Sequence, residues 1–230
     1  TGKTLFISGF ICISVMHLSN FLGIEKITSG WVTVAFFFIF LKSAWEIFEI
    51  KNNDIKSIKN LIEFGITDLG ENRLEELNLH QKYFSDAIYH FIAPLQSRKI
   101  SEVLLKCSVL HSVSRKKEID LISKYYSGQQ IFIQVNIDND PNKSGIDKNN
   151  VNNFVDYMKS KGIEASGLMC IPNIESERKI VFSEMQKLND NLKNKYKNYS
   201  GELSMGMSDD YEIALDYGAT IVRIGSKIFL

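Results

Sequence analysis

Two stretches near the end of the chain decide its fold, Glu202-Leu-Ser-Met-Gly-Met-Ser-Asp-Asp210 and Ile221-Val-Arg-Ile-Gly-Ser226. Each is typical of a short apolar strand that ends in small residues. Between them, Ser208 predicts the start of a helix that runs to about residue 217, and Gly218 is suited to end it in a left-handed conformation. Two small-residue turns side by side would present free backbone N–H groups, which can hold a phosphate.

The second stretch carries one charged side chain, Arg223, between Val222 and Ile224. A guanidinium among apolar residues must be paired, because burying it alone would be very costly. One interpretation of the two stretches is therefore a phosphate site beside a buried arginine. The other is an ordinary edge of an α/β fold, in which neighbouring groups satisfy a core arginine.

From Trp45 onward, apolar strand-like runs alternate with helical patterns. Eight strands are predicted, at 45–50, 66–69, 88–92, 109–113, 131–137 and 165–171 and in the two C-terminal stretches. Each but the last is followed by a predicted helix, which indicates an α/β fold with a buried parallel sheet. Eight such units favour a closed (β/α)8 barrel of the TIM type, with residues 45–230 as a single domain. Such barrels usually hold phosphate after strands seven and eight, and this favours the phosphate interpretation.

Residues 1–44 differ from the remainder of the chain. Two apolar runs, at 5–16 and 31–41, have almost no charge, and each is shorter than the roughly 18–20 residues that a membrane helix needs. We treat 1–44 as a separate, atypical hydrophobic segment. Its three interpretations are a membrane-associating hairpin, buried helix or strand material, and a sequence foreign to the barrel domain.

Charge and cysteine usage restrict the class of protein. Lysine plus arginine and aspartate plus glutamate number 27 each, so no basic surplus indicates a nucleic-acid partner. Three widely spaced cysteines and four isolated histidines form neither a disulfide framework nor a metal-ligand motif. The composition predicts a soluble protein of the cytoplasm without a metal site, and membrane association through residues 1–44 is the minor alternative.

Lys51 follows the first predicted strand, at the same end of the barrel as the phosphate site. A desolvated lysine has a lowered pKa, so its neutral amine can attack an aldehyde and form a Schiff base. An aldehyde that also carries a phosphate, such as pyridoxal 5′-phosphate (PLP), would use both features. On position alone, a lysine after a strand is more often a solvated loop residue.

From about Trp45 to its end, the chain resembles the pyridoxal phosphate homeostasis protein family, whose barrel is similar to the N-terminal domain of alanine racemases. The motifs follow one another in the order and at the spacing of that family. They are Gly70-Glu-Asn-Arg73, His90-Phe-Ile-Ala-Pro-Leu-Gln-Ser-Arg-Lys99, Val135-Asn136 with Lys143-Ser-Gly145, Gly167-Leu-Met-Cys-Ile-Pro172, Leu203-Ser-Met-Gly-Met-Ser-Asp-Asp210 and Val222-Arg-Ile-Gly-Ser226.

The resemblance implies PLP as the cofactor and a Schiff base on Lys51, which stands fourteen residues before Gly65, where the family places its lysine. It also implies that Arg223 approaches the pyridine nitrogen and keeps it unprotonated, because two positive charges in one buried site repel. The remaining cofactor-binding positions that it implies are Ser204, Gly206, Gly225 and Ser226 around the phosphate and Asn72, His90 and Met169 in the pocket wall.

In function, the resemblance implies a monomeric carrier that holds PLP and delivers it to apo forms of PLP-dependent enzymes. A small racemase-like PLP enzyme is the first alternative, although it would require an opposing base, which alanine racemases take from a second domain. A degenerate or membrane-tethered member is the second. It is motivated by the hydrophobic residues 1–44 and by departures from the family pattern at Ile50 and Asn52 beside the lysine, at Leu69 and at Ala93.

Overall fold

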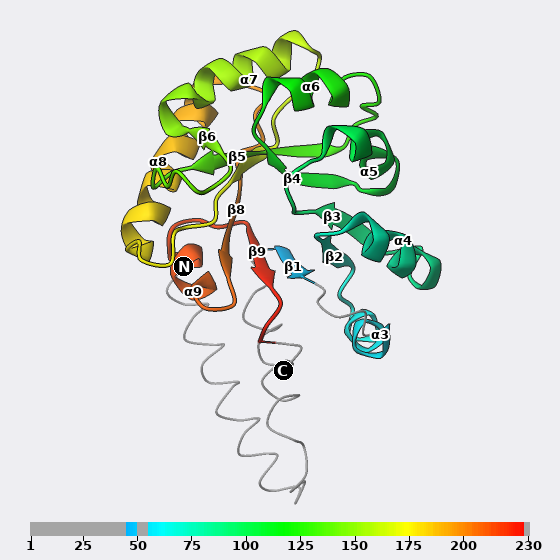
Figure 1. The fold of residues 1–230 in the computed structure, drawn as a ribbon. Coiled ribbons are helices and arrows are strands. Elements are labelled where there is room, and N and C mark those ends of the chain that lie inside the picture. The colour runs from blue at the N-terminus through cyan, green and yellow to red at the C-terminus, as the bar shows by residue number, and fades with distance from the viewer. Residues whose placement is uncertain (1–44, 50–54, 228–230) are drawn as a thin grey trace, which may run out of the picture. The chain divides into compact units, whose positions relative to one another are not determined.

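Eight parallel strands form a closed ring in the computed structural model, which describes residues 45–49 and 55–227 (Figure 1). Each strand pairs with the next, β4 pairs with β5, and β1 pairs with β9, so the ring has no open edge. The strands of the ring are β1 (Trp45–Glu49), β2 (Asp68–Glu71), β3 (Ile88–Phe91), β4 (Val109–Val113), β5 (Gln130–Asn136), β7 (Gly167–Met169), β8 (Glu202–Met207) and β9 (Ile221–Ile224). The predicted (β/α)8 barrel is confirmed.

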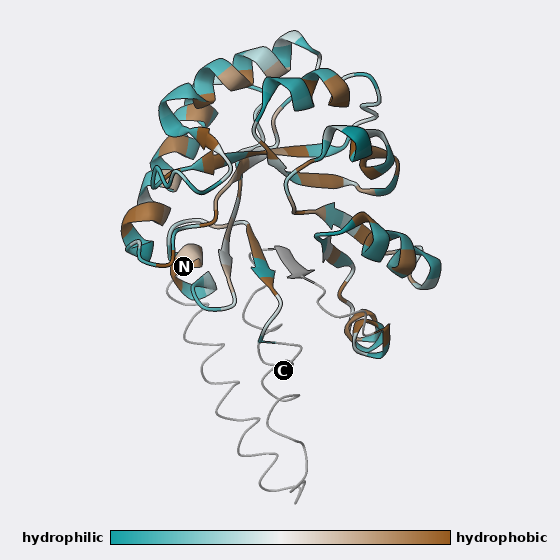
Figure 2. Ribbon diagram, in the orientation of Figure 1, coloured by the Kyte–Doolittle hydropathy of each residue, from teal (hydrophilic) through white to brown (hydrophobic). Residues whose placement is uncertain are grey.

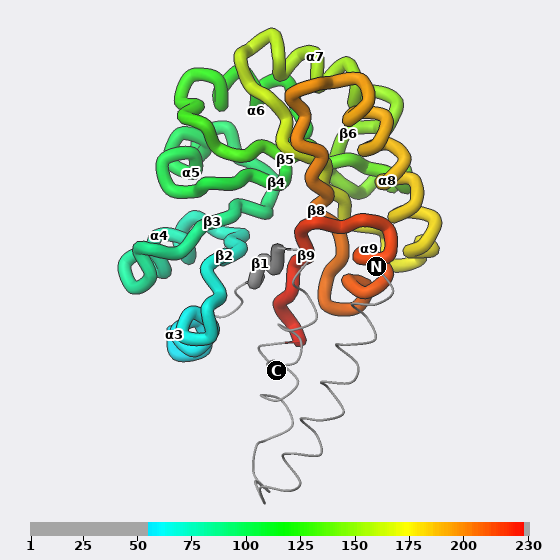
Figure 3. Tube along the Cα trace, turned by 180° about the vertical axis from the view of Figure 1, so that it is seen from behind, coloured from blue at the N-terminus to red at the C-terminus, as the bar shows by residue number. Residues whose placement is uncertain are grey.

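The helices lie outside the ring, as the tube seen from behind also shows (Figure 3). They are α3 (Ile55–Glu63), α4 (Leu74–Tyr83), α5 (Ile100–Lys106), α6 (Lys116–Ile122), α7 (Val151–Ser160), α8 (Arg178–Lys195) and α9 (Tyr211–Asp216), with one 3-10 turn before α5, η1 (Ser97–Lys99), and another before α7, η2 (Lys148–Asn150). Gly218 has a φ of +81°, in the left-handed region where glycine is favoured, and α9 ends just before it, as predicted.

The barrel interior is filled by side chains that alternate along the strands with side chains facing the helices. One interior cluster consists of Ile92, Val109, Phe132, Met169 and Ile221, none more than 4% exposed. Hydrophobic colour is strong in β4 and β5, and the helices carry both hydrophobic and hydrophilic residues (Figure 2). This is the pattern of amphipathic helices that cover a buried parallel sheet.

Two local features differ from the sequence prediction. The helix after β8 begins at Tyr211 and not at Ser208, because a tight turn precedes it. In this turn the carboxylate of Asp210 accepts a hydrogen bond from the Met207 amide at 2.7 Å, and the Asp210 amide donates to the Met207 carbonyl at 3.1 Å. The second difference is β6 (Ile146–Asp147), a two-residue strand beside β5 that is too short to give a hydropathy signal.

Residues 1–44 and Lys51 lie outside the described residues. The separate hydrophobic segment, its membrane-associating interpretation and the domain boundary at 45 therefore stay predictions. Within the ranges 45–49 and 55–227, no helix has both the length and the apolar character needed to cross a membrane.

Candidate functional site

Arg223 lies inside the barrel, on β9, with only 1% of its surface exposed. One guanidinium nitrogen, Nη1, donates to the Ser204 hydroxyl on β8 at 2.8 Å, and the other, Nη2, donates to the Cys170 carbonyl at 3.0 Å. Hydrogen bonds to a charged donor compensate part of the cost of burial. The prediction that Arg223 is a paired core arginine is therefore confirmed, and both of these acceptors are neutral groups.

A chain of buried hydrogen bonds continues from Ser204 across the barrel. The Ser204 hydroxyl lies 3.0 Å from His111 Nδ1, and His111 Nε2 lies 3.0 Å from His90 Nδ1. His90 Nε2 in turn lies 3.0 Å from a carboxylate oxygen of Asp68. The two histidines are 0% exposed, and the His111 ring stacks on Phe132 at a centroid distance of 4.7 Å. The three neighbouring strands β2, β3 and β4 are thus joined through the barrel interior to β8 and β9 on its other side.

The surroundings shift two pKa values in this chain. Burial is the main cause that lowers the pKa of His111 well below its usual 6.5, and His90 and Arg223 add to the effect. For Asp68, burial acts to raise the pKa, but hydrogen bonds from His90 and Thr67 outweigh it and leave the pKa below the usual 3.8. In this chain of hydrogen bonds, a neutral His111 therefore lies between the cation Arg223 at one end and the anion Asp68 at the other.

The turns after β8 and β9 are fastened to each other. The Gly225 amide donates to the Ser208 hydroxyl at 3.3 Å, and both residues are buried, whereas Ser226 beside them is exposed. The turn after β8 includes two acids, and the carboxylate of Asp210 is neutralised by Arg178, whose Nε lies 2.7 Å from it. The donors at these turns are backbone amides and hydroxyls, a set that suits a phosphate.

Gly206 allows the close packing of β8 against α9. Its φ is +90°, in the left-handed region, and a Cβ at this position would lie 2.6 Å from the Ala214 Cβ and 2.9 Å from the Tyr211 Cα. Only glycine therefore lets the chain turn here without moving the helix. The glycine expected on the phosphate side of the site thus shapes the turn.

The other predicted site residues fall into different places. His90 is in the barrel interior with both ring nitrogens already engaged, and Met169 is a fully buried member of the interior hydrophobic cluster. Asn72 is exposed at the rim, where it lines a hollow. Lys51 lies outside the described residues, so its position relative to Arg223 stays a prediction.

His111 is a buried polar residue of the site that sequence reasoning did not single out. It stands between Val109 and Val113 with the two-residue spacing of one strand face, and all three are buried. The same spacing puts His90 on the interior face of β3 together with Ile92. Two histidines on the interior faces of neighbouring strands would have been the signal.

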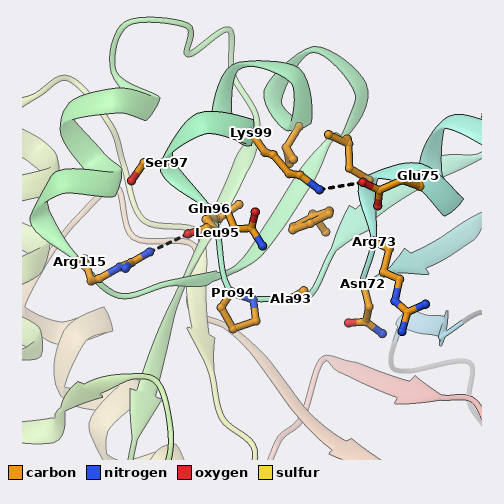
Figure 4. A pocket seen from close by; sticks show the side chains of 13 residues that line it. Asn72, Arg73, Glu75, Ala93, Pro94, Leu95, Gln96, Ser97, Lys99 and Arg115 are labelled. Carbon is orange, nitrogen blue, oxygen red and sulfur yellow. Dashed lines mark hydrogen bonds and ion pairs between the residues drawn. The ribbon is translucent and has the colours of Figure 1, made fainter.

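The hollow beside Asn72 has a volume of about 660 Å³ and lies where the loops after β2, β3 and β4 meet (Figure 4). Two sequence motifs of the resemblance, 70–73 and 90–99, contribute most of its lining. Lys99 in its wall is ion-paired with Glu75 at 2.9 Å, and Arg115 is ion-paired with Glu118 at 2.5 Å. Its charges are therefore largely compensated, which gives the hollow a polar but not an electropositive character.

The loops after β5 and β7 are joined by hydrogen bonds at the same end of the barrel. The carboxylate of Asp138 accepts from the Asn173 amide at 2.5 Å and from the Ser176 hydroxyl at 2.9 Å. Lys143, in the loop after β5, donates to the Ile171 carbonyl at 3.0 Å. This lysine therefore holds one loop to the next.

In the part of the chain that the structure describes, no group of three histidine, cysteine or acidic side chains is placed to bind a metal ion. Cys107 and Cys170 are buried and unbridged, and burial raises the pKa of each thiol to about 12. These two cysteines therefore behave as small core residues.

Comparison with known protein families matches residues 52–230 to alanine racemase, N-terminal domain. The pyridoxal phosphate homeostasis protein of Aquifex aeolicus is 34% identical over 185 residues, which are 75% of this chain and 80% of that protein. Among solved structures, PipY of Synechococcus elongatus PCC7942 without PLP gives a TM-score of 0.79 at 25% identity and covers 86% of this chain and 98% of that chain. The structure of PipY with PLP bound gives 0.71 at 22% identity, covering 82% and 93%, and shows likeness of fold.

Proposed function

Because the chain belongs to the pyridoxal phosphate homeostasis protein family, we propose that it binds PLP at the mouth of its barrel and holds it for delivery to other proteins. The observation that carries this proposal is Arg223, buried in the barrel and held by the neutral acceptors Ser204 and the Cys170 carbonyl. The PLP-bound PipY structure, which has the same fold, supports the choice of ligand.

Each part of the site has a role in this proposal. Arg223 would face the pyridine nitrogen as a permanent cation and would disfavour protonation of that nitrogen by charge repulsion. The turns that carry Gly206, Gly225 and Ser226 would hold the phosphate, and Lys51 would supply an amine to the aldehyde. The Ser204 hydroxyl is engaged with Arg223 and His111, so its role would be to hold Arg223. When bound, the cofactor supplies an aldehyde and an electron-withdrawing ring.

A carrier is favoured over a catalyst by the state of the two histidines. A general acid or base must reach the proton that it transfers. His90 and His111 are buried, and each of their four ring nitrogens already lies within hydrogen-bonding distance of another group of the chain. The proposal therefore assigns them no proton transfer to a substrate.

The test compares PLP with pyridoxal, which lacks the phosphate, by titration against the purified protein. We expect PLP to bind at least ~10-fold more tightly, because the turns after β8 and β9 supply charge-assisted hydrogen bonds to the phosphate. Equal affinity for the two compounds would contradict the phosphate site. Release is tested by mixing the loaded protein with an apo PLP-dependent enzyme and a phosphatase that destroys free PLP. Recovery of enzyme activity would support delivery of PLP. Without recovery, the proposed role would be reduced to storage of PLP.

Turnover is tested separately. Amino acids are incubated with the PLP-loaded protein in deuterium oxide, and mass spectrometry follows incorporation at the α-carbon. We expect no incorporation above that of PLP alone. Faster incorporation would favour the racemase-like alternative.

A further inference from the structure

The chain of hydrogen bonds from Arg223 to Asp68 has a single direction. A guanidinium can only donate, so Arg223 Nη1–H donates to the Ser204 oxygen at 2.8 Å. At the other end an ionised carboxylate can only accept, so His90 Nε2 carries the proton that it donates to Asp68 at 3.0 Å. The Asp68 end fixes the direction at His90, and at the other end the Ser204 oxygen, which accepts from Arg223, still has its own hydrogen to donate to His111.

The interior members of the chain follow from these two ends. With its proton on Nε2, a neutral His90 accepts at Nδ1, so His111 Nε2 must donate to it at 3.0 Å. His111 then accepts at Nδ1, where the hydrogen of the Ser204 hydroxyl points, also at 3.0 Å. In this arrangement each hydrogen between Arg223 and Asp68 has one acceptor, and both rings carry a proton on Nε2.

A charged His111 would break this order. Its two ring N–H groups would then face His90 and Ser204, and the Ser204 oxygen would receive donors from both His111 and Arg223. The groups that face His111 are His90, Ser204 and the Phe132 ring, with the Arg223 charge behind Ser204. None of them is an anion that would stabilise a second positive charge.

We infer that His111 and His90 are positioning residues for Arg223, an inference that rests on the proposed function. The bond between His111 on β4 and Ser204 on β8 crosses the barrel, since β4 pairs with β3 and β5 and β8 pairs with β7 and β9. It orients the Ser204 hydroxyl so that an oxygen lone pair faces the guanidinium. The anchor is Asp68, whose side chain is 17% exposed at the start of β2, and through it the protein fixes Arg223 against the pyridine nitrogen.

The direct test is long-range ¹H–¹⁵N NMR of the cofactor-free protein, which reports the tautomer and charge of each histidine. We expect both rings to carry a proton on Nε2, and His111 to stay neutral between pH ~5.5 and 8, the range in which an ordinary histidine titrates. A proton on Nδ1 of either ring, or a charged His111 in this range, would overturn the inference. Because no cofactor is present, this result does not depend on PLP binding.

Asp68→Ala is the variant that separates positioning from packing. Asp68 is partly exposed, so its loss leaves the barrel interior filled. Without the anchor, His90 is free to exchange tautomers, and we expect the ¹⁵N signals of His111, the next residue along the chain, to change with it. Signals of His111 identical to those of the wild type would show that the chain transmits nothing and would overturn the inference.

The functional test uses His111→Phe, which keeps the ring but removes both hydrogen bonds. Its matched control is His80→Phe, because His80 forms an equally buried pair with Glu71 at 2.6 Å on the outer face of β2, under α4. We expect His111→Phe to weaken PLP binding at least ~10-fold, the loss that follows when a charge-assisted contact is misplaced, and His80→Phe to leave the affinity unchanged. Equal affinities of the two variants would overturn the positioning role. Absence of PLP binding to the wild type would overturn the proposed function instead, and the NMR result would still decide the order of the chain.

Discussion

Replacing Ser204 by alanine removes a side chain that joins Arg223 to His111. Its hydroxyl is fully buried, accepts from Arg223 at 2.8 Å and lies 3.0 Å from His111 Nδ1. Alanine fills nearly the same space, so the change leaves packing almost intact. What is lost is one hydrogen bond to a charged group and one between neutral groups.

The size of the effect follows from these two bonds. A bond to a charged partner contributes ~1.5–3 kcal/mol and a neutral bond ~0.5–1.5 kcal/mol, so the free energy of unfolding should fall by about 3 kcal/mol. A domain of ordinary stability, ~5–15 kcal/mol, remains folded after such a loss. Ser112→Ala is the matched control, since Ser112 is also buried on a barrel strand but makes a single neutral bond to the Ala93 carbonyl. It should cost about 1 kcal/mol.

Urea unfolding of the two variants and the wild type, followed by circular dichroism, measures these differences. PLP titration of the same proteins should show weaker binding for Ser204→Ala and wild-type binding for Ser112→Ala. If Ser204→Ala cost no more than Ser112→Ala and bound PLP normally, the reasoning about the buried chain would be refuted.

Three further predictions concern pH, backbone and thiols. The pKa of Asp68 is lowered in the folded protein, so its ionised carboxylate contributes to the free energy of unfolding above the usual pKa of 3.8. This contribution is lost as the pH falls through the lowered pKa. The free energy of unfolding of Asp68→Asn, followed during acid titration, should therefore not show this fall. Gly206→Ala should lower the free energy of unfolding, measured in urea, by more than ~2 kcal/mol and should weaken PLP binding. Gly128 also has a positive φ, +102°, but a Cβ there would meet open space, so Gly128→Ala should lower the free energy of unfolding by only about 1 kcal/mol and leave PLP binding unchanged. Equal losses in the two variants would contradict the clash with α9. Cys107 and Cys170 should resist a thiol-alkylating reagent at pH 8 until the protein unfolds. Alkylation of either cysteine in the folded protein, detected by mass spectrometry, would contradict their burial.

The fold could be predicted because each strand and helix is indicated by the hydrophobic pattern of its own short segment of sequence. The run at 131–137 is β-branched and apolar, and the structure has β5 at Gln130–Asn136, one residue displaced. Eight such runs with intervening helices leave a closed barrel as the natural arrangement. The start of α9 was predicted wrongly at Ser208, since an Asp210 side chain that folds back on the Met207 amide competes with a helix cap.

The site could be predicted only in part. The need to pair Arg223 follows from its apolar neighbours, but its partner Ser204 is on another strand, at a point where the β8–β9 register shifts. The contact between His111 and Ser204 joins residues 93 positions apart across the barrel. Such contacts depend on the stagger and tilt of the strands, which no local pattern contains.

Borohydride trapping tests the central claim most directly. The protein is incubated with PLP, reduced, digested and analysed by mass spectrometry, beside Lys51→Ala and the control Lys143→Ala, whose lysine donates to the Ile171 carbonyl in the loop after β7. We predict one stable pyridoxyl adduct, on Lys51, that persists in Lys143→Ala and is absent in Lys51→Ala. An adduct on another lysine, or none in a folded wild-type protein saturated with PLP, would contradict the account.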